Sequence, residues 1–227
     1  MEKNNSKKKT SRFSHWFFDL DNTLYCANSG IFNQIHKRMG EFICKNLDVS
    51  LKEAKYLQKK YFIKNGTTLR GLMTHHGVKP KKFLEYVHDI DFDIIKPDTK
   101  LNNLLNKISD KKIIFTNADK IYAEKILTKL NLVNAFDDIF DIKKANYIPK
   151  PDIKTYKKLI QTYSLDVQKT ILFDDIPNNL IPAANLGLTT VQVYNKNLDE
   201  ELNGVSEKID YITNNLKEWL QTWIKKN

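Results

Sequence analysis

The sequence has few cysteines and no long apolar run, and each shortage excludes a class of protein. Cys26 and Cys44 are the only cysteines among 227 residues, too few for a disulfide framework and without the CxxC spacing of a metal or redox site. No apolar run approaches the roughly 18 residues that span a bilayer. No apolar region follows the basic residues near the N-terminus, as it would in a secretory signal. These shortages predict a soluble, cytoplasmic protein without a membrane partner.

Arginine is also scarce, although the formal net charge is +10. A nucleic-acid-binding protein is one interpretation of such a charge, because clustered cations neutralise phosphates. Only three of the 37 basic residues are arginine, and the lysines are scattered along the chain. We therefore expect a solvated lysine-rich surface and no nucleic-acid partner. The lysines at positions 7–9 lie in a polar stretch, residues 1–14, that reads as a disordered tail.

Short apolar segments alternate with helical patterns over most of the chain. Between the segments, apolar residues recur at helical spacing, and the last such pattern runs from Leu216 to Ile224. Strands that alternate with helices indicate an α/β protein with a doubly wound, Rossmann-like parallel sheet. The segments that we expect to be strands are 15–20, 112–115, 170–173 and 189–194.

One stretch, residues 27–95, interrupts this alternation. It contains helical patterns and no convincing strand, beginning with a long apolar face between Ile31 and Leu47. Further helices are expected at 54–62, 69–75 and 81–88, separated by Gly66, Gly77 and Pro80. We interpret this stretch as a helical cap inserted into a core that consists of residues 15–26 and 96–227.

Polar residues follow three of the predicted strands directly. In a doubly wound sheet these positions share one crevice at the carboxyl ends of the strands. Four carboxylates near one point cannot all stay ionised without a cation, and oxygen ligands favour Mg²⁺. The alternative is that each carboxylate caps a helix or closes a turn. The residues concerned are Asp19 and Asp21 after the first strand, Thr116 and Asn117 after the second, and Asp174 and Asp175 after the third.

Four short blocks of the sequence combine carboxylates, a hydroxyl group and a lysine. The blocks are Asp19-Leu20-Asp21-Asn22-Thr23-Leu24, Phe115-Thr116-Asn117, Lys150-Pro151-Asp152 and Asp174-Asp175. In this order they resemble the signature motifs of the haloacid dehalogenase (HAD) superfamily. The resemblance extends from about residue 15 to residue 193, and the first block is specific by itself.

The resemblance implies a role for each matching residue in a phosphatase. Asp19 matches the nucleophile, and Asp21 matches the general acid and base, whose main-chain carbonyl also binds Mg²⁺. Asp19 and Asp174 match direct metal ligands, with Asp175 acting in support through water. The residues that match the groups holding the phosphoryl oxygens are Thr116 and Lys150. The dehalogenase branch has the same nucleophile but lacks the acid and the metal, so Asp21 favours a phosphatase.

The predicted cap contains a second, narrower resemblance, to the pyrimidine 5′-nucleotidase group. It is carried by the octapeptide 65–72, by the segment 95–98 and by Tyr25 after the first block. Arg70 is either a planar donor for a substrate or an ordinary surface arginine. Thr67 and Thr68 form either a substrate-facing turn or a helix N-cap. The adjacent His75 and His76 point to different sides of a helix and make a poor metal pair.

The expected substrate is a nucleoside monophosphate such as UMP or CMP, bound by Thr67, Thr68, Arg70 and Asn117. Other interpretations stay open at this point. A phosphosugar or phosphoglycolate would use the same chemistry, as would a phosphomutase. A noncatalytic nucleotide- or nucleic-acid-binding protein on the same fold is a different class, although every catalytic position has a candidate residue. The sequence says nothing about oligomeric state.

Overall fold

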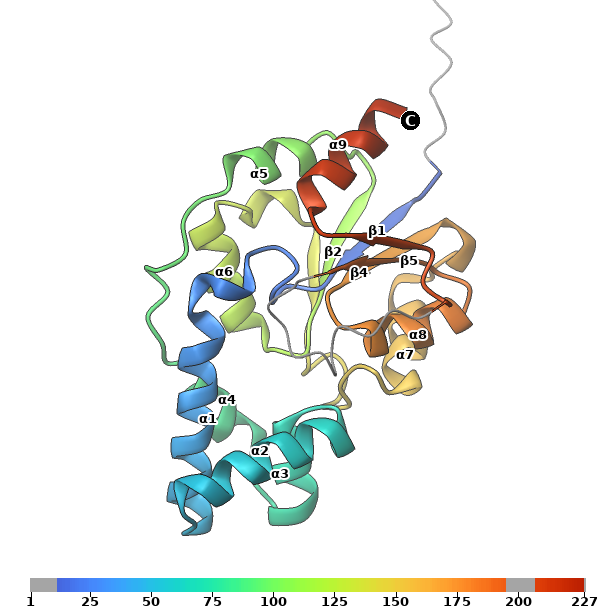
Figure 1. Cartoon of the computed structure of the whole chain (residues 1–227). Coiled ribbons are helices and arrows are strands. Elements are labelled where there is room, and N and C mark those ends of the chain that lie inside the picture. The colour runs from blue at the N-terminus through green and yellow to red at the C-terminus, as the bar shows by residue number, and fades with distance from the viewer. Residues whose placement is uncertain (1–11, 195–206, 227) are drawn as a thin grey trace, which may run out of the picture.

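A parallel sheet of six strands lies at the centre of the protein, which we describe from a computed structural model for residues 12–194 and 207–226 (Figure 1). The strand order is β3-β2-β1-β4-β5-β6, and each neighbouring pair is parallel. β1 therefore lies inside the sheet, where the strand order changes direction, and this is where such sheets bind ligands. The strands are β1 (His15–Phe18), β2 (Lys111–Phe115), β3 (Asp138–Phe140), β4 (Thr170–Asp174), β5 (Thr189–Val193) and β6 (Tyr211–Thr213).

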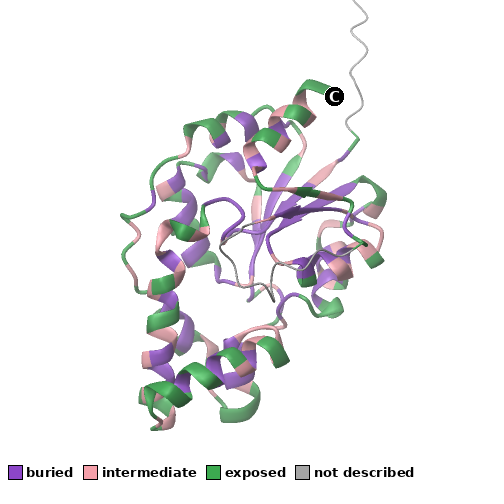
Figure 2. Ribbon diagram, in the orientation of Figure 1, coloured by how far each residue is buried: buried purple, intermediate pink, exposed green. Residues whose placement is uncertain are grey.

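Helices cover both faces of this sheet. α5 (Thr99–Leu105), α6 (Lys120–Leu130) and α9 (Leu216–Lys226) pack on one face, and α7 (Ile153–Tyr163) and α8 (Pro177–Asn185) on the other. Side chains alternate between the two faces along β1. Trp16 and Phe18 belong to the hydrophobic cluster on one face, and Phe17 belongs to the cluster on the other. Figure 2 shows the inner strands almost wholly buried, whereas the edge strand β6 has no buried residue. The predicted doubly wound α/β fold is confirmed.

The remaining helices follow β1 and form what we call the insert, residues 27–95. They are α1 (Ile31–Leu47), α2 (Leu51–Asn65), α3 (Thr68–His76) and α4 (Pro80–Val87). A hydrophobic cluster of their own side chains holds them together, with Ile142 added from the core. α2 and α3 lie at the opposite end of the molecule from α9 (Figure 1). Short 3₁₀ turns complete the description: η1 (Ala27–Ser29), η2 (Val133–Ala135) and η3 (Val167–Lys169).

Side-chain caps explain where several helices begin. Ser50 accepts a hydrogen bond from the backbone N–H of Glu53 at the start of α2. Aspartates perform the same task for three further helices. Of the carboxylates at the strand ends, Asp174 closes a turn, because its Oδ1 accepts the backbone N–H of Ile176 at 2.9 Å. The capping aspartates are Asp98 for α5, Asp119 for α6 and Asp152 for α7.

Three findings correct or limit the sequence analysis. Phe13, which we assigned to the tail, is buried and packs against Trp16 and Trp223, because this side of β1 is covered by α9. Residues 1–11 of the predicted tail lie outside the described part of the chain. β3 and β6 were not predicted, since three residues are too few to show an alternating pattern.

Among the described helices, none has the length and apolar character needed to cross a membrane.

Candidate active site

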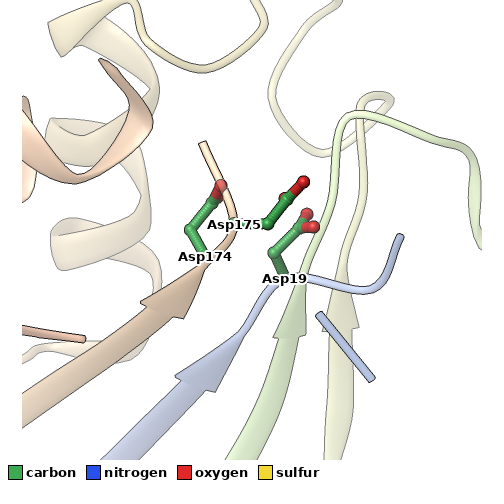
Figure 3. A group of neighbouring side chains, drawn as sticks. All are labelled: Asp19, Asp174 and Asp175. Atoms are coloured by element: carbon green, nitrogen blue, oxygen red, sulfur yellow. The ribbon is translucent and has the colours of Figure 1, made fainter. Parts of the chain in front are cut away.

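Three aspartates from two neighbouring strands meet at the carboxyl edge of the sheet. Asp19 follows β1, Asp174 is the last residue of β4, and Asp175 comes directly after it (Figure 3). The parallel pairing of β1 with β4 fixes this meeting, because Phe18 lies opposite Phe173 and the backbone N–H of Asp19 donates to the carbonyl of Phe173. All three carboxylates are buried, with 7%, 0% and 2% of each residue exposed. The sequence-predicted convergence of these carboxylates is present in the structure.

Lys150 supplies the positive charge inside this cluster. Its ammonium donates to Asp19 Oδ1 at 2.7 Å and to Asp174 Oδ2 at 2.6 Å. A third hydrogen bond, of 2.8 Å, goes to the carbonyl of Phe115 at the end of β2. All three ammonium protons are thus engaged, so a contact with a phosphoryl oxygen would replace or share one of these bonds.

The electrostatics of the cluster follow from its burial. The pKa of Asp19 is raised to about 7. Burial is the largest cause and the charge of Asp174 adds to it, while Lys150 acts in the opposite direction. Burial, together with the charges of Asp174 and Asp19, also holds the pKa of Asp175 well above its usual range. Burial lowers the pKa of Lys150, but the two carboxylates outweigh this and raise it above the usual 10.5. The carboxylates therefore need more positive charge than one lysine provides.

The same cluster fits a hard divalent cation. One oxygen from each of Asp19, Asp174 and Asp175 lies within 4.8 Å of the others. When all three carboxylates ionise, one ammonium leaves two negative charges uncompensated, which is the charge that a divalent ion neutralises. The donors are all oxygen, as Mg²⁺ prefers. The residues present can therefore hold such an ion.

Asp21 lies beside this cluster, and its carboxylate is held by two tyrosines. The hydroxyls of Tyr25 and Tyr122 donate to the same oxygen, Asp21 Oδ1, at 2.5 and 2.7 Å. Burial raises the pKa of Asp21, while these two hydrogen bonds lower it. A carboxyl group with a raised pKa is suited to exchange a proton near neutral pH.

Thr116 and Asn117 follow β2 as predicted, and both lie next to the cluster. Thr116 is buried, and its Oγ1 accepts the N–H of Ala118 at 3.0 Å. The side-chain amide of Asn117 binds the main chain of Lys150 twice: Oδ1 accepts its N–H at 2.8 Å, and Nδ2 donates to its carbonyl at 3.2 Å. Asn117 therefore fixes the position of Lys150, a role that the sequence did not predict.

The candidate residues of the insert are used in different ways. Thr67 is the N-cap of α3, accepting the N–H of Arg70, and buried Thr68 donates to the carbonyl of Gln58. The capping alternative for Thr67 is thus confirmed. Within the described part of the chain, the half-buried guanidinium of Arg70 makes no hydrogen bond or ion pair. His75 stacks on Tyr61 and His76 binds the hydroxyl of the same ring at 2.6 Å. The expectation that the two histidines point to different sides of the helix is therefore wrong, because both reach one side chain of α2.

Several residues of the site were missed from the sequence. Asn179 is buried and donates to both oxygens of Asp174, at 3.0 and 3.2 Å. Nδ2 of Asn22 lies 3.4 Å from Asp175 Oδ2. Both residues belong to the polar runs after β1 and β4, which is the signal that pointed to them. Tyr122 had no such signal, because its position in an α-helix reads as one more apolar residue.

Comparison with known proteins agrees with this geometry. The family described as haloacid dehalogenase-like hydrolase matches residues 16–193, more than three quarters of the chain. Phosphate metabolism protein 8 of Saccharomyces cerevisiae is 27% identical in an alignment of 191 positions that covers 76% of this chain. The chain spans 59% of the length of that relative.

Solved structures share the fold at low sequence identity. A HAD phosphatase from Thermococcus onnurineus is 19% identical with a TM-score of 0.61, covering 92% of this chain and 97% of that one. L-2-haloacid dehalogenase from Xanthobacter autotrophicus is 13% identical with a TM-score of 0.59, over 92% and 97%. YfnB of Bacillus subtilis, in a structure bound to magnesium, is 15% identical with a TM-score of 0.58, over 94% and 99%.

These likenesses show the fold and leave the reaction to the residues of the site, since the structures include both dehalogenases and a phosphatase. The family match is independent of them and contains all four blocks in full, including the nucleophile candidate Asp19, the lysine Lys150 and the pair at 174–175. By sequence, by fold and by the arrangement of its buried carboxylates, the chain belongs to the haloacid dehalogenase-like hydrolases.

Proposed function

We propose that this hydrolase is a magnesium-dependent phosphatase that breaks phosphate monoesters through a phosphorylated Asp19. The observation that carries the proposal is the buried cluster of Asp19, Asp174 and Asp175 around Lys150. Mg²⁺ would be held by Asp19, Asp174 and the main-chain carbonyl of Asp21, with Asp175 acting through water. When bound, it offsets the negative charge that keeps a carboxylate away from a phosphate.

The residues of the chain divide the reaction into two steps. An oxygen of Asp19 attacks phosphorus, the bond from phosphorus to the leaving oxygen breaks, and Asp21 donates its proton to that oxygen. Water then attacks the phosphorus of the phosphorylated Asp19, and Asp21 accepts a proton from that water. The bond from phosphorus to the Asp19 oxygen breaks, which restores the carboxylate and releases inorganic phosphate. Lys150 and Thr116 stabilise the charge on the phosphoryl oxygens.

Asp21 also favours a phosphatase over a dehalogenase. The resemblance implies that dehalogenases of the family share the nucleophile and lack the acid. In this chain Asp21 is present, has a raised pKa because of its burial, and lies two residues from Asp19. These features support phosphoryl transfer to and from Asp19, in which a leaving alcohol needs a proton.

The insert acts as a cap that selects the leaving group, and a pyrimidine nucleoside 5′-monophosphate is the proposed substrate. The octapeptide 65–72 supports this choice through its resemblance to pyrimidine 5′-nucleotidases. Its Gly66 lies against the loop of Lys150, since a Cβ at Gly66 would be 3.1 Å from the Lys150 carbonyl oxygen. Arg70, four residues on, makes no hydrogen bond or ion pair through its guanidinium with residues 12–194 or 207–226, and it is the proposed donor to a base edge or phosphate.

The experiment that tests the proposal is phosphate release from a panel of nucleoside monophosphates and sugar phosphates, with Mg²⁺ and with a chelator. Asp19→Asn removes the nucleophile with little change in shape and is expected to lower the rate at least about 100-fold. Magnesium-dependent release that is strongest with UMP or CMP supports both the chemistry and the substrate. Release from sugar phosphates alone keeps the chemistry and rejects the nucleotide. No release that depends on Asp19 favours a noncatalytic binding protein.

A further inference from the structure

Two tyrosine hydroxyls converge on one oxygen of the acid and base. Tyr25 donates to Asp21 Oδ1 at 2.5 Å, and Tyr122 donates to the same atom at 2.7 Å. The two hydroxyl oxygens are themselves 3.2 Å apart. We propose that Tyr25 and Tyr122 are positioning residues that fix the carboxyl group of Asp21 so that Oδ2 alone transfers the proton. This inference rests on the proposed phosphatase function.

The two tyrosines come from different elements, and both are rigidly placed. Tyr25 follows Asp21 by four residues in the loop after β1, and only 9% of it is exposed. Tyr122 is in the first turn of α6, is 1% exposed, and donates its N–H to the capping carboxylate of Asp119 at 3.0 Å. The ring of His88, from the end of α4, stacks on the Tyr122 ring at 4.2 Å between centroids. The contact between the insert and α6 thus supports one of the two donors.

Two donors on Oδ1 determine which oxygen carries the proton. A carboxyl proton on Oδ1 would face the incoming hydroxyl hydrogens, so protonation is directed to Oδ2. Oδ2 accepts no hydrogen bond from any residue within 12–194 or 207–226. Each tyrosine hydroxyl has one hydrogen to donate, and both hydroxyls lie within hydrogen-bond distance of Oδ1. The pair therefore leaves one defined atom for proton transfer.

Loss of the Tyr25 or Tyr122 hydroxyl frees the Asp21 carboxyl group to rotate. The resulting loss of kcat/KM depends on the leaving group. A sugar alkoxide is a poor leaving group and needs the proton, whereas a nitrophenolate leaves readily without it. The value of kcat/KM reports the step in which the leaving oxygen departs and excludes the later hydrolysis. The ratio of kcat/KM for UMP to that for p-nitrophenyl phosphate thus isolates the acid function of Asp21.

The experiment measures this ratio in Tyr25→Phe, Tyr122→Phe and Asp21→Asn, with melting temperatures to confirm folding. Phenylalanine keeps each ring and removes only the hydroxyl. We expect the ratio to fall about 10-fold or more in each tyrosine variant and further in Asp21→Asn, since general acid catalysis contributes about 100- to 10,000-fold. In an Asp21→Asn background, either tyrosine change is expected to have no further effect on the ratio. The matched control is Tyr163→Phe, whose hydroxyl donates to Asp138 at 2.7 Å and which should keep the ratio of the native chain.

The outcomes separate this inference from the function on which it rests. If kcat/KM in the tyrosine variants falls equally for both substrates, or does not fall, Tyr25 and Tyr122 are not positioning residues. If kcat/KM in Asp21→Asn then falls for UMP more than for p-nitrophenyl phosphate, Asp21 still acts as the acid. An unchanged ratio in Asp21→Asn overturns the acid function of Asp21 and the pair with it. If another alkyl phosphate is the substrate found by the panel, it replaces UMP in the ratio. A native chain that releases no phosphate from any member of the panel overturns both proposals.

Discussion

At the scale of a single residue, Lys150 balances part of the negative charge of the buried carboxylates. A buried ammonium is costly by itself, and here two carboxylates and a carbonyl accept its three protons. The same bonds keep Asp19 and Asp174 from repelling each other. Asn117 then fixes the Lys150 backbone from the neighbouring strand end. The lysine is therefore both part of the proposed chemistry and a structural centre of the core.

Lys150→Met removes the ammonium and keeps most of the side-chain volume. We expect the free energy of unfolding without metal to fall by about 3 kcal/mol, because Asp19 and Asp174 lose their shared partner. Phosphate release is expected to fall at least about 100-fold. Denaturant unfolding and the substrate panel measure the two effects. Lys144→Met, which breaks a more exposed pair with Asp138, is the control and should change stability by less than about 1 kcal/mol. Equal effects of the two changes would contradict this prediction.

Asp119 gives a pH-dependent prediction away from the metal cluster. Burial opposes its ionisation, but His88, the N–H of Tyr122 and Lys143 outweigh it and lower the pKa of Asp119 to about 2. A folded-state pKa below the unfolded value stabilises the protein above about pH 4, and the contribution is lost as the pH falls through about 2. The shift corresponds to about 2 kcal/mol.

Asp119→Asn keeps an acceptor for the Tyr122 N–H and removes the charge. The native chain is expected to be more stable than this variant by about 2 kcal/mol near pH 6, and the difference should shrink as the pH is lowered from 4 toward 2. Unfolding by denaturant at several pH values measures it. A difference that stays constant between pH 6 and 3 would contradict the assignment.

At the scale of elements, α2 and α3 pack closely because Gly71 has no side chain. A Cβ at this position would lie 2.2 Å from the ring of Tyr61, far inside van der Waals contact. Gly71→Ala is therefore expected to destabilise the insert by about 1 to 3 kcal/mol, as overpacking does. Gly40→Ala is the matched control, since its Cβ meets Leu51 at an ordinary 3.4 Å and alanine favours a helix by up to about 1 kcal/mol. Thermal unfolding of both variants measures these effects, and an equal change in stability in the two variants would contradict the prediction.

The elements also show what could be predicted from the sequence. Three strands were visible because each is a short apolar run followed by polar residues, and that same rule placed Asp19, Asp174 and Asp175 together. The fourth predicted strand, β5, was visible from its β propensity. β3 and β6 were not visible, because their three residues become strands only through pairing with β2 and β5. The position of Tyr122 depends on how α6 packs on the loop after β1, a long-range contact with no local pattern. Phe13 was missed for the same reason, since α9 covers it from the other end of the chain.

At the scale of the whole molecule, the excess negative charge of the buried cluster predicts that a divalent cation stabilises the fold. Mg²⁺ that binds only the folded chain adds about 2.7 kcal/mol when its concentration is 100 times its Kd. We therefore expect the melting temperature to rise with Mg²⁺, in a measurement that needs no substrate. Asp174→Asn should abolish the rise, whereas Asp152→Asn, at the N-cap of α7 and outside the cluster, should keep it. An equal rise in both variants would contradict a metal site at Asp174.

The tryptophans that pack between β1 and α9 give the protein a built-in optical reporter. Trp16, Trp219 and Trp223 are its only tryptophans, and their rings pack against one another with centroids 5.3 to 6.4 Å apart. Intrinsic tryptophan emission therefore reports the sheet and α9, while α2 and α3 at the other end of the molecule contribute none (Figure 1). Loosening of the insert alone will be silent in fluorescence but visible in far-ultraviolet circular dichroism. Recording both signals during one unfolding experiment thus shows whether the two regions melt together.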